Sequence, residues 1–127
     1  MEEQILERLK IGKERYGHGV IVNSDTREWG TPKNSWIDMA VEEFLDAVIY
    51  VIADYIRMGR QSDTSMSELE MGYTTNDPSD DNGLIMYILK NHEKIESPKH
   101  HMMVETLLNT LSASSQFWGV PQFAWGA

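Results

Sequence analysis

The sequence predicts an all-α protein, a helical bundle of about four helices. Two observations predict this fold class. Apolar residues recur at three- and four-residue spacing in several segments, and residues that start or stop helices stand beside those segments. The stretches between them are rich in Gly, Asn, Asp, Ser, Thr and Pro, which is typical of loops.

The first helix is expected over residues 2–16, with Gly17 as its C-terminal stop. Its apolar stripe consists of Ile5, Leu6 and Leu9. Residues 17–34 are rich in Gly, Asn, Asp, Thr and Pro, so we expect a loop there, with at most a short strand or turn over residues 19–23.

The central helix is expected over residues 35–59. Ser35 followed by Asp38 is a capping box, and Gly59 marks the expected end. The stretch AVIYVIA, residues 47–53, carries no charge, so we expect protein to cover every face of the helix there. This helix should lie at the centre of the bundle, antiparallel to the first one.

Residues 61–82 contain many Ser, Thr, Asp, Asn and Met residues and should form a long acidic loop. A shorter helix is expected over residues 83–95. Another is expected over residues 98–115, because Ser97 is a good N-cap and a proline fits the first helical position. Its apolar face consists of Val104, Leu107, Leu108 and Leu111. Residues 116–127 should be an irregular aromatic tail.

The chain has 127 residues, enough for one hydrophobic core, so residues 1–127 are expected to form a single domain. So apolar a central helix, with few helices to flank it, predicts a homodimer or homotetramer. The formal charge of −9 argues against a nucleic-acid-binding protein, which needs a basic surface. The chain has no cysteine, no apolar run long enough for a membrane span and no signal peptide, so we expect a cytoplasmic protein without membrane partners.

Three acidic residues on the central helix carry the strongest chemical signal. Glu42, Glu43 and Asp46 fall within an arc of about 100° on consecutive turns, and the nearest cation on this helix is Arg57. Like charges at this spacing cost about 0.2–0.5 kcal/mol per pair. A bound cation would offset that cost, and oxygen ligands suit Mg²⁺ or Mn²⁺. The trio also fits the solvated face of an amphipathic helix, so the pattern leaves both interpretations open.

The segment EEFLDAVIYVIADYI, with Glu43 and Asp46 three apart, resembles the helix signature of the MazG-like, all-α nucleoside triphosphate pyrophosphohydrolases. The upstream pattern RYGHGV…EWG…W is similar to the entry loop of phage-type relatives. The resemblance covers roughly residues 8–57. It implies a Mg²⁺-dependent enzyme that cleaves a nucleoside triphosphate, (d)NTP, to (d)NMP and pyrophosphate.

The resemblance also implies roles for the acidic trio. Glu43 and Asp46 match the family's second acidic pair and would be metal ligands. Glu42 would be a further ligand or the base that orients water, so Glu42 and Glu43 are the candidate catalytic residues. The family's first pair, E-x-x-E on a preceding helix, has no counterpart in this sequence. Glu105 or a second protomer could complete the site. The alternative function is a non-catalytic, phage-type interaction or accessory protein that keeps the scaffold.

Four other residues are candidates for binding the nucleotide. Lys13 and Arg15 lie nearest the loop in a basic segment and could hold phosphates. His18, between two glycines, could contact the ligand, and Trp36 could stack on the base. Each residue also has a purely structural explanation. Asp54 is interpreted as a surface charge.

Overall fold

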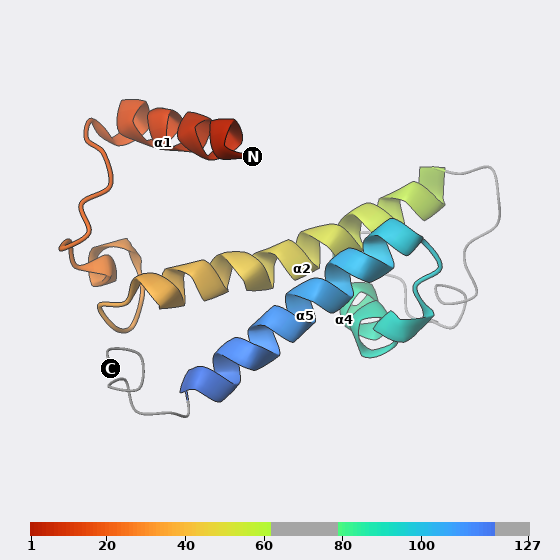
Figure 1. The fold of residues 1–127 in the computed structure, drawn as a ribbon. Coiled ribbons are helices and arrows are strands. Elements are labelled where there is room, and N and C mark those ends of the chain that lie inside the picture. Colours follow the sequence, from red (N-terminus) through yellow and green to blue (C-terminus); the bar gives the residue numbers. More distant parts are fainter. Residues whose placement is uncertain (62–78, 119–127) are drawn as a thin grey trace. The chain divides into compact units, whose positions relative to one another are not determined.

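The computed structural model describes residues 1–61 and 79–118, with side chains as far as residue 113. It contains four α-helices and no strand within those ranges, which confirms the all-α prediction (Figure 1). The helices are α1 (Glu2–Tyr16), α2 (Trp36–Gln61), α4 (Asn82–Lys90) and α5 (Pro98–Trp118). The chain divides into two compact units, Met1–Asp38 and Met39–Ala127. No helix in the described ranges is long and apolar enough to cross a membrane.

The first unit begins with α1, whose bounds agree with the sequence prediction. Gly17 takes a left-handed conformation with φ 80°, and its N–H donates to the Lys13 carbonyl at 2.9 Å. This is the conformation that glycine adopts most easily, and it ends the helix. Within the described residues no side chain of α1 is buried. The predicted antiparallel packing of this helix on the central helix stays a prediction.

The segment between α1 and α2 is more ordered than the loop prediction implies. A turn closes when the Ser24 N–H donates to the Ile21 carbonyl at 2.9 Å, and a short 3-10 helix spans Thr26–Trp29. Asp25 caps this helix, since its carboxylate accepts the Arg27 N–H at 2.9 Å.

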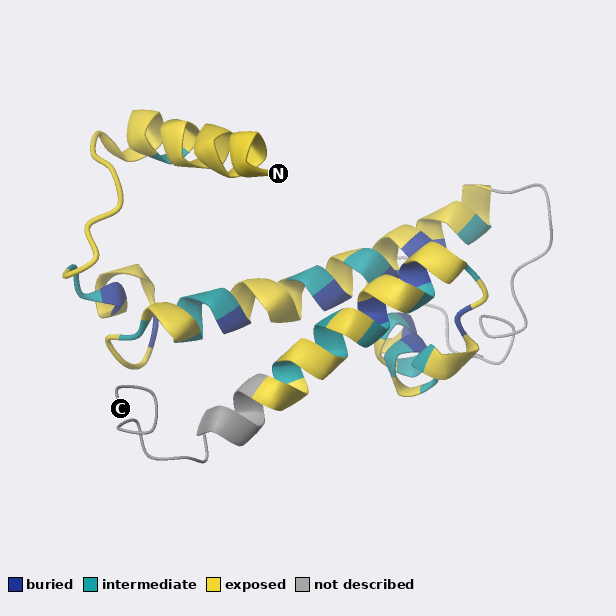
Figure 2. Cartoon of the chain, in the orientation of Figure 1, coloured by how far each residue is buried: buried dark blue, intermediate teal, exposed yellow. Residues whose placement is uncertain are grey.

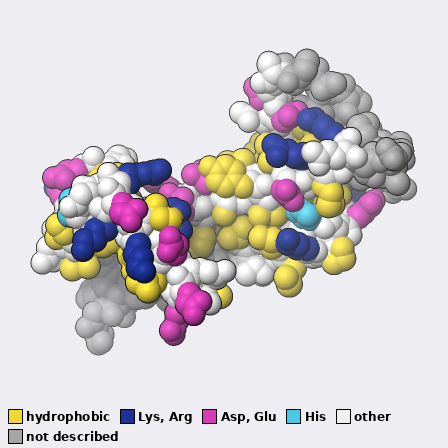
Figure 3. All heavy atoms as spheres, turned by 90° about the horizontal axis from the view of Figure 1, so that it is seen from above, with side chains coloured by type: hydrophobic (Ala, Val, Ile, Leu, Met, Phe, Trp, Pro, Cys, Tyr) yellow, Lys and Arg dark blue, Asp and Glu magenta, His cyan; other side chains and the backbone are white. Residues whose placement is uncertain are grey.

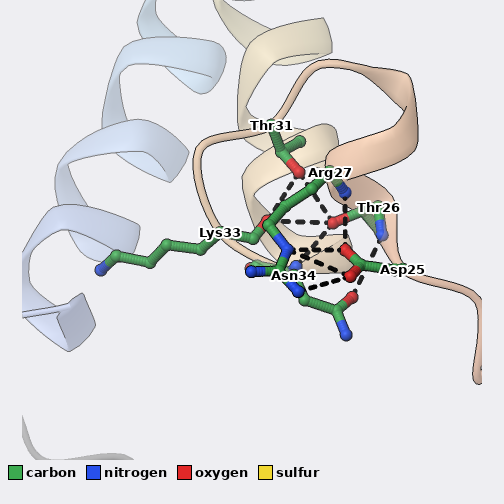
Figure 4. A network of polar contacts seen from close by, with 7 residues as sticks. Asp25, Thr26, Arg27, Thr31, Lys33 and Asn34 are labelled. Carbon is green, nitrogen blue, oxygen red and sulfur yellow. Dashed lines mark hydrogen bonds and ion pairs between the residues drawn. The ribbon is translucent and has the colours of Figure 1, made fainter.

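The side chain of Thr26 organises this segment (Figure 4). Its hydroxyl is fully buried and lies 2.8 Å from the hydroxyl of Thr31 and 3.1 Å from the Lys33 carbonyl. The Thr26 backbone N–H donates to the side-chain oxygen of Asn34 at 3.1 Å. Each buried polar group therefore has a partner, which allows the loop to bury threonines instead of apolar residues.

The start of α2 confirms one half of the predicted capping box. The Ser35 hydroxyl accepts the Asp38 N–H at 3.2 Å, as an N-cap should. The Ser35 N–H, which the box assigns to the Asp38 carboxylate, donates instead to the Thr26 hydroxyl at 2.6 Å. The loop therefore replaces the second half of the box.

The second unit is built on one face of α2, against which α4 and α5 pack (Figure 2). Ile52 from α2, Ile88 from α4 and Val104 from α5 are all fully buried. The predicted apolar face of α5 is confirmed, because Leu107, Leu108 and Leu111 pack against the same core. Apolar burial of this kind is the main stabilising contribution to the unit.

Within the single chain α2 is not covered on every face, so the coverage expected from its apolar stretch depends on the predicted second protomer and stays a prediction. Ile49 and Tyr50 are 45% and 66% exposed, whereas the neighbouring Val48 and Ile52 are buried. The reason is that α4 and α5 belong to one core cluster with a single face of α2. Hydrophobic side chains are accordingly visible at the surface among charged ones (Figure 3).

The C-terminal ends of three helices, α2, α4 and α5, differ from the sequence prediction. The helix α2 continues past Gly59 to Gln61. Gly59 does not adopt the positive φ that ends a helix; among the described residues only Gly17 and Gly30 do. The helix predicted over 83–95 ends at Lys90 instead. The side chain of Asn91 donates to the Tyr87 carbonyl at 2.8 Å, so this polar side chain competes with the helical hydrogen bonds. A 3-10 turn, His92–Lys94, follows it.

The start of α5 agrees with the prediction, since the Ser97 carbonyl accepts the His101 N–H at 2.9 Å. Its end does not, because the helix continues to Trp118 and so includes the first residues of the predicted tail. The rest of that tail, and most of the predicted acidic loop at 61–82, lie outside the described residues.

Candidate functional site

The acidic trio lies on α2, within the second unit. Glu42, Glu43 and Asp46 are all exposed. None of them forms an ion pair with any described residue. The three carboxylates are therefore accessible, and no cation in the described part of the chain lies within ion-pair distance of them.

The trio does not form a complete metal site by itself. Among the described residues, no group of three or more His, Asp or Glu side chains is placed so that it could hold a metal ion. Mg²⁺ nevertheless needs few protein ligands, since it usually keeps several waters and takes one or two carboxylates together with substrate phosphates. Two carboxylates of the trio would supply that number of protein ligands, and the remaining ligands would come from water and phosphate.

Glu105 already contacts two histidines, His92 and His101, so it would have to leave them to become a metal ligand. Its carboxylate forms a hydrogen bond with His92 Nδ1, and one of its oxygens lies 3.7 Å from His101 Nε2. His92 belongs to the 3-10 turn before α5, and His101 lies one turn before Glu105 on α5 itself. This carboxylate therefore connects the turn to the helix.

The basic candidates lie in the first unit. Lys13 and Arg15 occupy the last turn of α1, where their charges also complement the helix dipole. Both residues are exposed. The His18 ring makes one local contact, with Nδ1 2.8 Å from the Gly19 carbonyl oxygen. These three side chains are accessible to a ligand from the end of α1 and the loop that follows.

Trp36 already has two partners in the first unit. Its indole N–H donates to the Val22 carbonyl at 2.9 Å, and its ring centroid lies 5.7 Å from that of Trp29 with a 33° angle between the planes. Trp36 is 38% exposed and Trp29 is 45% exposed. Trp29 is, like Trp36, a tryptophan that could stack on a base, but no local sequence pattern reveals the contact between the two rings across this loop.

Two interactions of the second unit were also missed. His100, 6% exposed, lies between Asp54 and Ser97, with 2.7 Å from Nε2 to the Asp54 carboxylate and 2.6 Å from Nδ1 to the Ser97 hydroxyl. The hydrogen bond from His100 is the main cause that lowers the pKa of Asp54, and the charges of Lys99 and Arg57 contribute further. Asp54 is exposed, as expected, but it also connects α2 to α5.

Comparison with protein families, with curated proteins and with solved structures found no match to this chain.

Proposed function

We propose that this protein is a Mg²⁺-dependent nucleotide pyrophosphohydrolase that cleaves (d)NTP to (d)NMP and pyrophosphate. The observation that carries the proposal is the trio Glu42, Glu43 and Asp46. These are three accessible carboxylates within about two turns of one helix, and none has an ion-pair partner among the described residues. The resemblance of this segment to the MazG-like signature supports the same reaction.

Each residue has a defined role in this proposal. Glu43 and Asp46 would hold Mg²⁺, which neutralises phosphate charge and acidifies a bound water. Glu42 would accept a proton from the attacking water, whose oxygen bonds to phosphorus while the anhydride P–O bond between the α and β phosphates breaks. Lys13 and Arg15, at the end of α1, are the candidates from the sequence for hydrogen bonds to phosphate oxygens.

Recognition of the nucleoside would involve His18 and Trp36, which is partly exposed. An aromatic face binds any base by stacking, so this contact would add affinity without selecting one base. The proposal therefore does not select a base, and it covers both ribo- and deoxyribonucleoside triphosphates because none of the assigned residues has a role at the sugar.

The proposal includes self-association. Ile49 and Tyr50 form exposed apolar surface on α2, and larger patches of this kind on soluble proteins usually mark interfaces. A homodimer or homotetramer would cover them, and a second protomer would also bring further carboxylates. Sedimentation that finds only a folded monomer at micromolar concentration would contradict this part.

The experiment uses the full chain with Mg²⁺ or Mn²⁺ and a panel of ribo- and deoxyribonucleoside triphosphates, with pyrophosphate as the readout. Wild type and Glu93→Gln, an exposed acid outside the trio, should release pyrophosphate, whereas Asp46→Asn should not. No turnover with any nucleotide, and no thermal shift with Mg²⁺, would favour the second candidate function. That candidate is a non-catalytic interaction or accessory protein, favoured by the finding that the described residues form no complete metal site.

A further inference from the structure

We propose that Ser97 is a nucleophile, activated by His100 and Asp54, that reacts with activated carboxylic esters. This second reactive centre is independent of the acidic trio and of the proposed nucleotide chemistry. The Ser97 hydroxyl lies 2.6 Å from His100 Nδ1, and His100 Nε2 lies 2.7 Å from the Asp54 carboxylate. A nucleophile, a base and a carboxylate that orients the base are the three parts that acyl transfer requires.

The hydrogen-bond network assigns the protons. The Asp54 carboxylate can only accept, because hydrogen bonding to His100 and the nearby Lys99 and Arg57 keep it ionised. The hydrogen of a neutral His100 ring is therefore on Nε2. The lone pair of Nδ1 then faces Ser97, so the serine hydroxyl donates and the imidazole is placed as its general base. The two ring nitrogens are exchanged relative to the usual serine hydrolase arrangement, but their roles are the same.

The imidazole is held in place by its surroundings. His100 is 6% exposed, and the ring of Tyr55 packs beside it with 5.7 Å between centroids. The Tyr55 hydroxyl accepts the Glu96 N–H at 3.4 Å, which fixes the chain just before Ser97. Ser97 itself is half-buried. A base in a fixed position beside a hydroxyl is the arrangement that general base catalysis needs.

Ser35, the other N-cap serine in the described residues, caps its helix without a histidine. The contact between Ser97 and His100 is therefore more than capping requires. Ser35 caps α2 through the Asp38 N–H at 3.2 Å and contacts no imidazole in the described part of the chain. Ser97 also accepts a backbone N–H, that of His100, at 3.5 Å. Its contact with the His100 ring is much shorter, so the imidazole is the main partner of this hydroxyl.

The reaction follows from these positions. Ser97 Oγ bonds to the ester carbonyl carbon while its proton passes to His100 Nδ1, and Asp54 stabilises the imidazolium that forms. The ester C–O bond breaks, and the leaving alkoxide takes the proton back from His100. A water deprotonated by the same nitrogen then cleaves the acyl-Ser97 ester, releasing the acid and restoring the hydroxyl.

The test treats the full chain with a fluorophosphonate probe and identifies labelled residues by peptide mass spectrometry. The proposal predicts phosphonylation of Ser97 and not of Ser35, which is an internal control for an N-cap serine. His100→Gln should slow labelling at least about hundredfold, since general base catalysis contributes that much or more. Asp54→Asn should slow it less, and Glu93→Gln should not change it.

Two results would overturn the proposal: labelling of Ser97 no faster than that of Ser35, or undiminished labelling of a His100→Gln variant with a wild-type circular dichroism spectrum. If His100→Gln does not fold, the comparison of Ser97 with Ser35 in the wild-type chain decides alone. Hydrolysis of p-nitrophenyl acetate should be lost in Ser97→Asn, which retains an N-capping side chain. Pyrophosphate release by the same variant should be unchanged, so failure of one activity is distinguishable from failure of the other.

Discussion

The backbone N–H of Ser35 donates to the buried hydroxyl of Thr26, nine residues earlier, over 2.6 Å. The contact connects the 3-10 helix to the first turn of α2 and satisfies an N–H that the serine's own capping box leaves open. The Thr26 hydroxyl accepts this bond and also contacts the Thr31 hydroxyl and the Lys33 carbonyl. It is therefore a central element of the first unit.

We predict that Thr26→Val destabilises the first unit by about 1–3 kcal/mol, because the isosteric side chain leaves the partly buried Ser35 N–H without its acceptor. Thr26→Ser keeps the hydroxyl and should retain most of the stability. Chemical denaturation followed by near-ultraviolet circular dichroism, which reports on the Trp29–Trp36 pair, measures the difference. The matched control is Thr110→Val, since the Thr110 hydroxyl donates to the Thr106 carbonyl at an exposed position. An equal effect of both valine substitutions would contradict the role given to Thr26.

The second prediction concerns pH. The pKa values of Asp54 and Asp81 are lowered in the folded state, mainly by hydrogen bonds from His100 and Arg60 respectively. Because the folded pKa lies below the unfolded one, their contribution to stability is fully present above about pH 4. It is lost as the pH falls through the folded pKa, when protonation breaks each pair.

Urea midpoints measured from pH 6 to pH 2 should therefore fall steeply below about pH 4 in wild type. The fall should be shallower in Asp54→Asn and in Asp81→Asn. The exposed Glu93 forms no ion pair with the described residues, so Glu93→Gln should keep the wild-type profile. Identical profiles for all four proteins would show that these pairs do not contribute.

The third prediction concerns the trio. Mg²⁺ at about a hundredfold excess over its dissociation constant should stabilise the wild-type fold by about 2.7 kcal/mol. Asp46→Asn should remove this response and leave the metal-free protein no less stable, because the substitution also relieves repulsion from Glu42 and Glu43. Thermal melts of both proteins, in Mg²⁺ and in EDTA, measure these effects.

Two other outcomes of those melts have a different meaning. If Asp46 pairs with a buried cation, for example Arg57 of a second protomer, the substitution will cost several kcal/mol without any metal. If the trio is only a solvated face, Mg²⁺ will change neither melt. A wild-type melt that is the same in Mg²⁺ and in EDTA would contradict the metal site.

The fourth prediction concerns self-association. Ile49→Lys places a charge on the exposed apolar side of α2, so it should shift an oligomer to monomers without unfolding it. Met86→Lys is the matched control, since Met86 is 48% exposed on α4 and lies outside the proposed interface. Sedimentation velocity at micromolar concentration reads out both variants. An unchanged oligomer in Ile49→Lys would place the interface elsewhere.

The helices could be predicted because their signals are local. The N-cap at Ser35, the stop at Gly17 and the spacing of the apolar face of α5 each depend on residues within a few turns. Coverage of α2 could not be predicted in the same way. An apolar stretch has the same pattern whether neighbours cover one face or all of them, and Ile49 and Tyr50 are exposed.

In the candidate site, too, local spacing could be predicted and contacts between distant residues could not. Spacing places Glu42, Glu43 and Asp46 on one side of a helix, and the structure confirms that the segment is helical and exposed. Contacts between distant residues left no local signal. His100 and Asp54 are 46 residues apart, so their pairing depends on how α5 packs against α2.

The central claim is that the trio supports cleavage between the α and β phosphates of a nucleoside triphosphate. Phosphorus NMR of a deoxyribonucleoside triphosphate incubated with the full chain and Mg²⁺ tests it most directly, because it identifies the bond that breaks. The account predicts pyrophosphate and nucleoside monophosphate in equal amounts from wild type, and unchanged substrate with Asp46→Asn. Unchanged substrate with wild type, or orthophosphate and nucleoside diphosphate in place of those products, would contradict it.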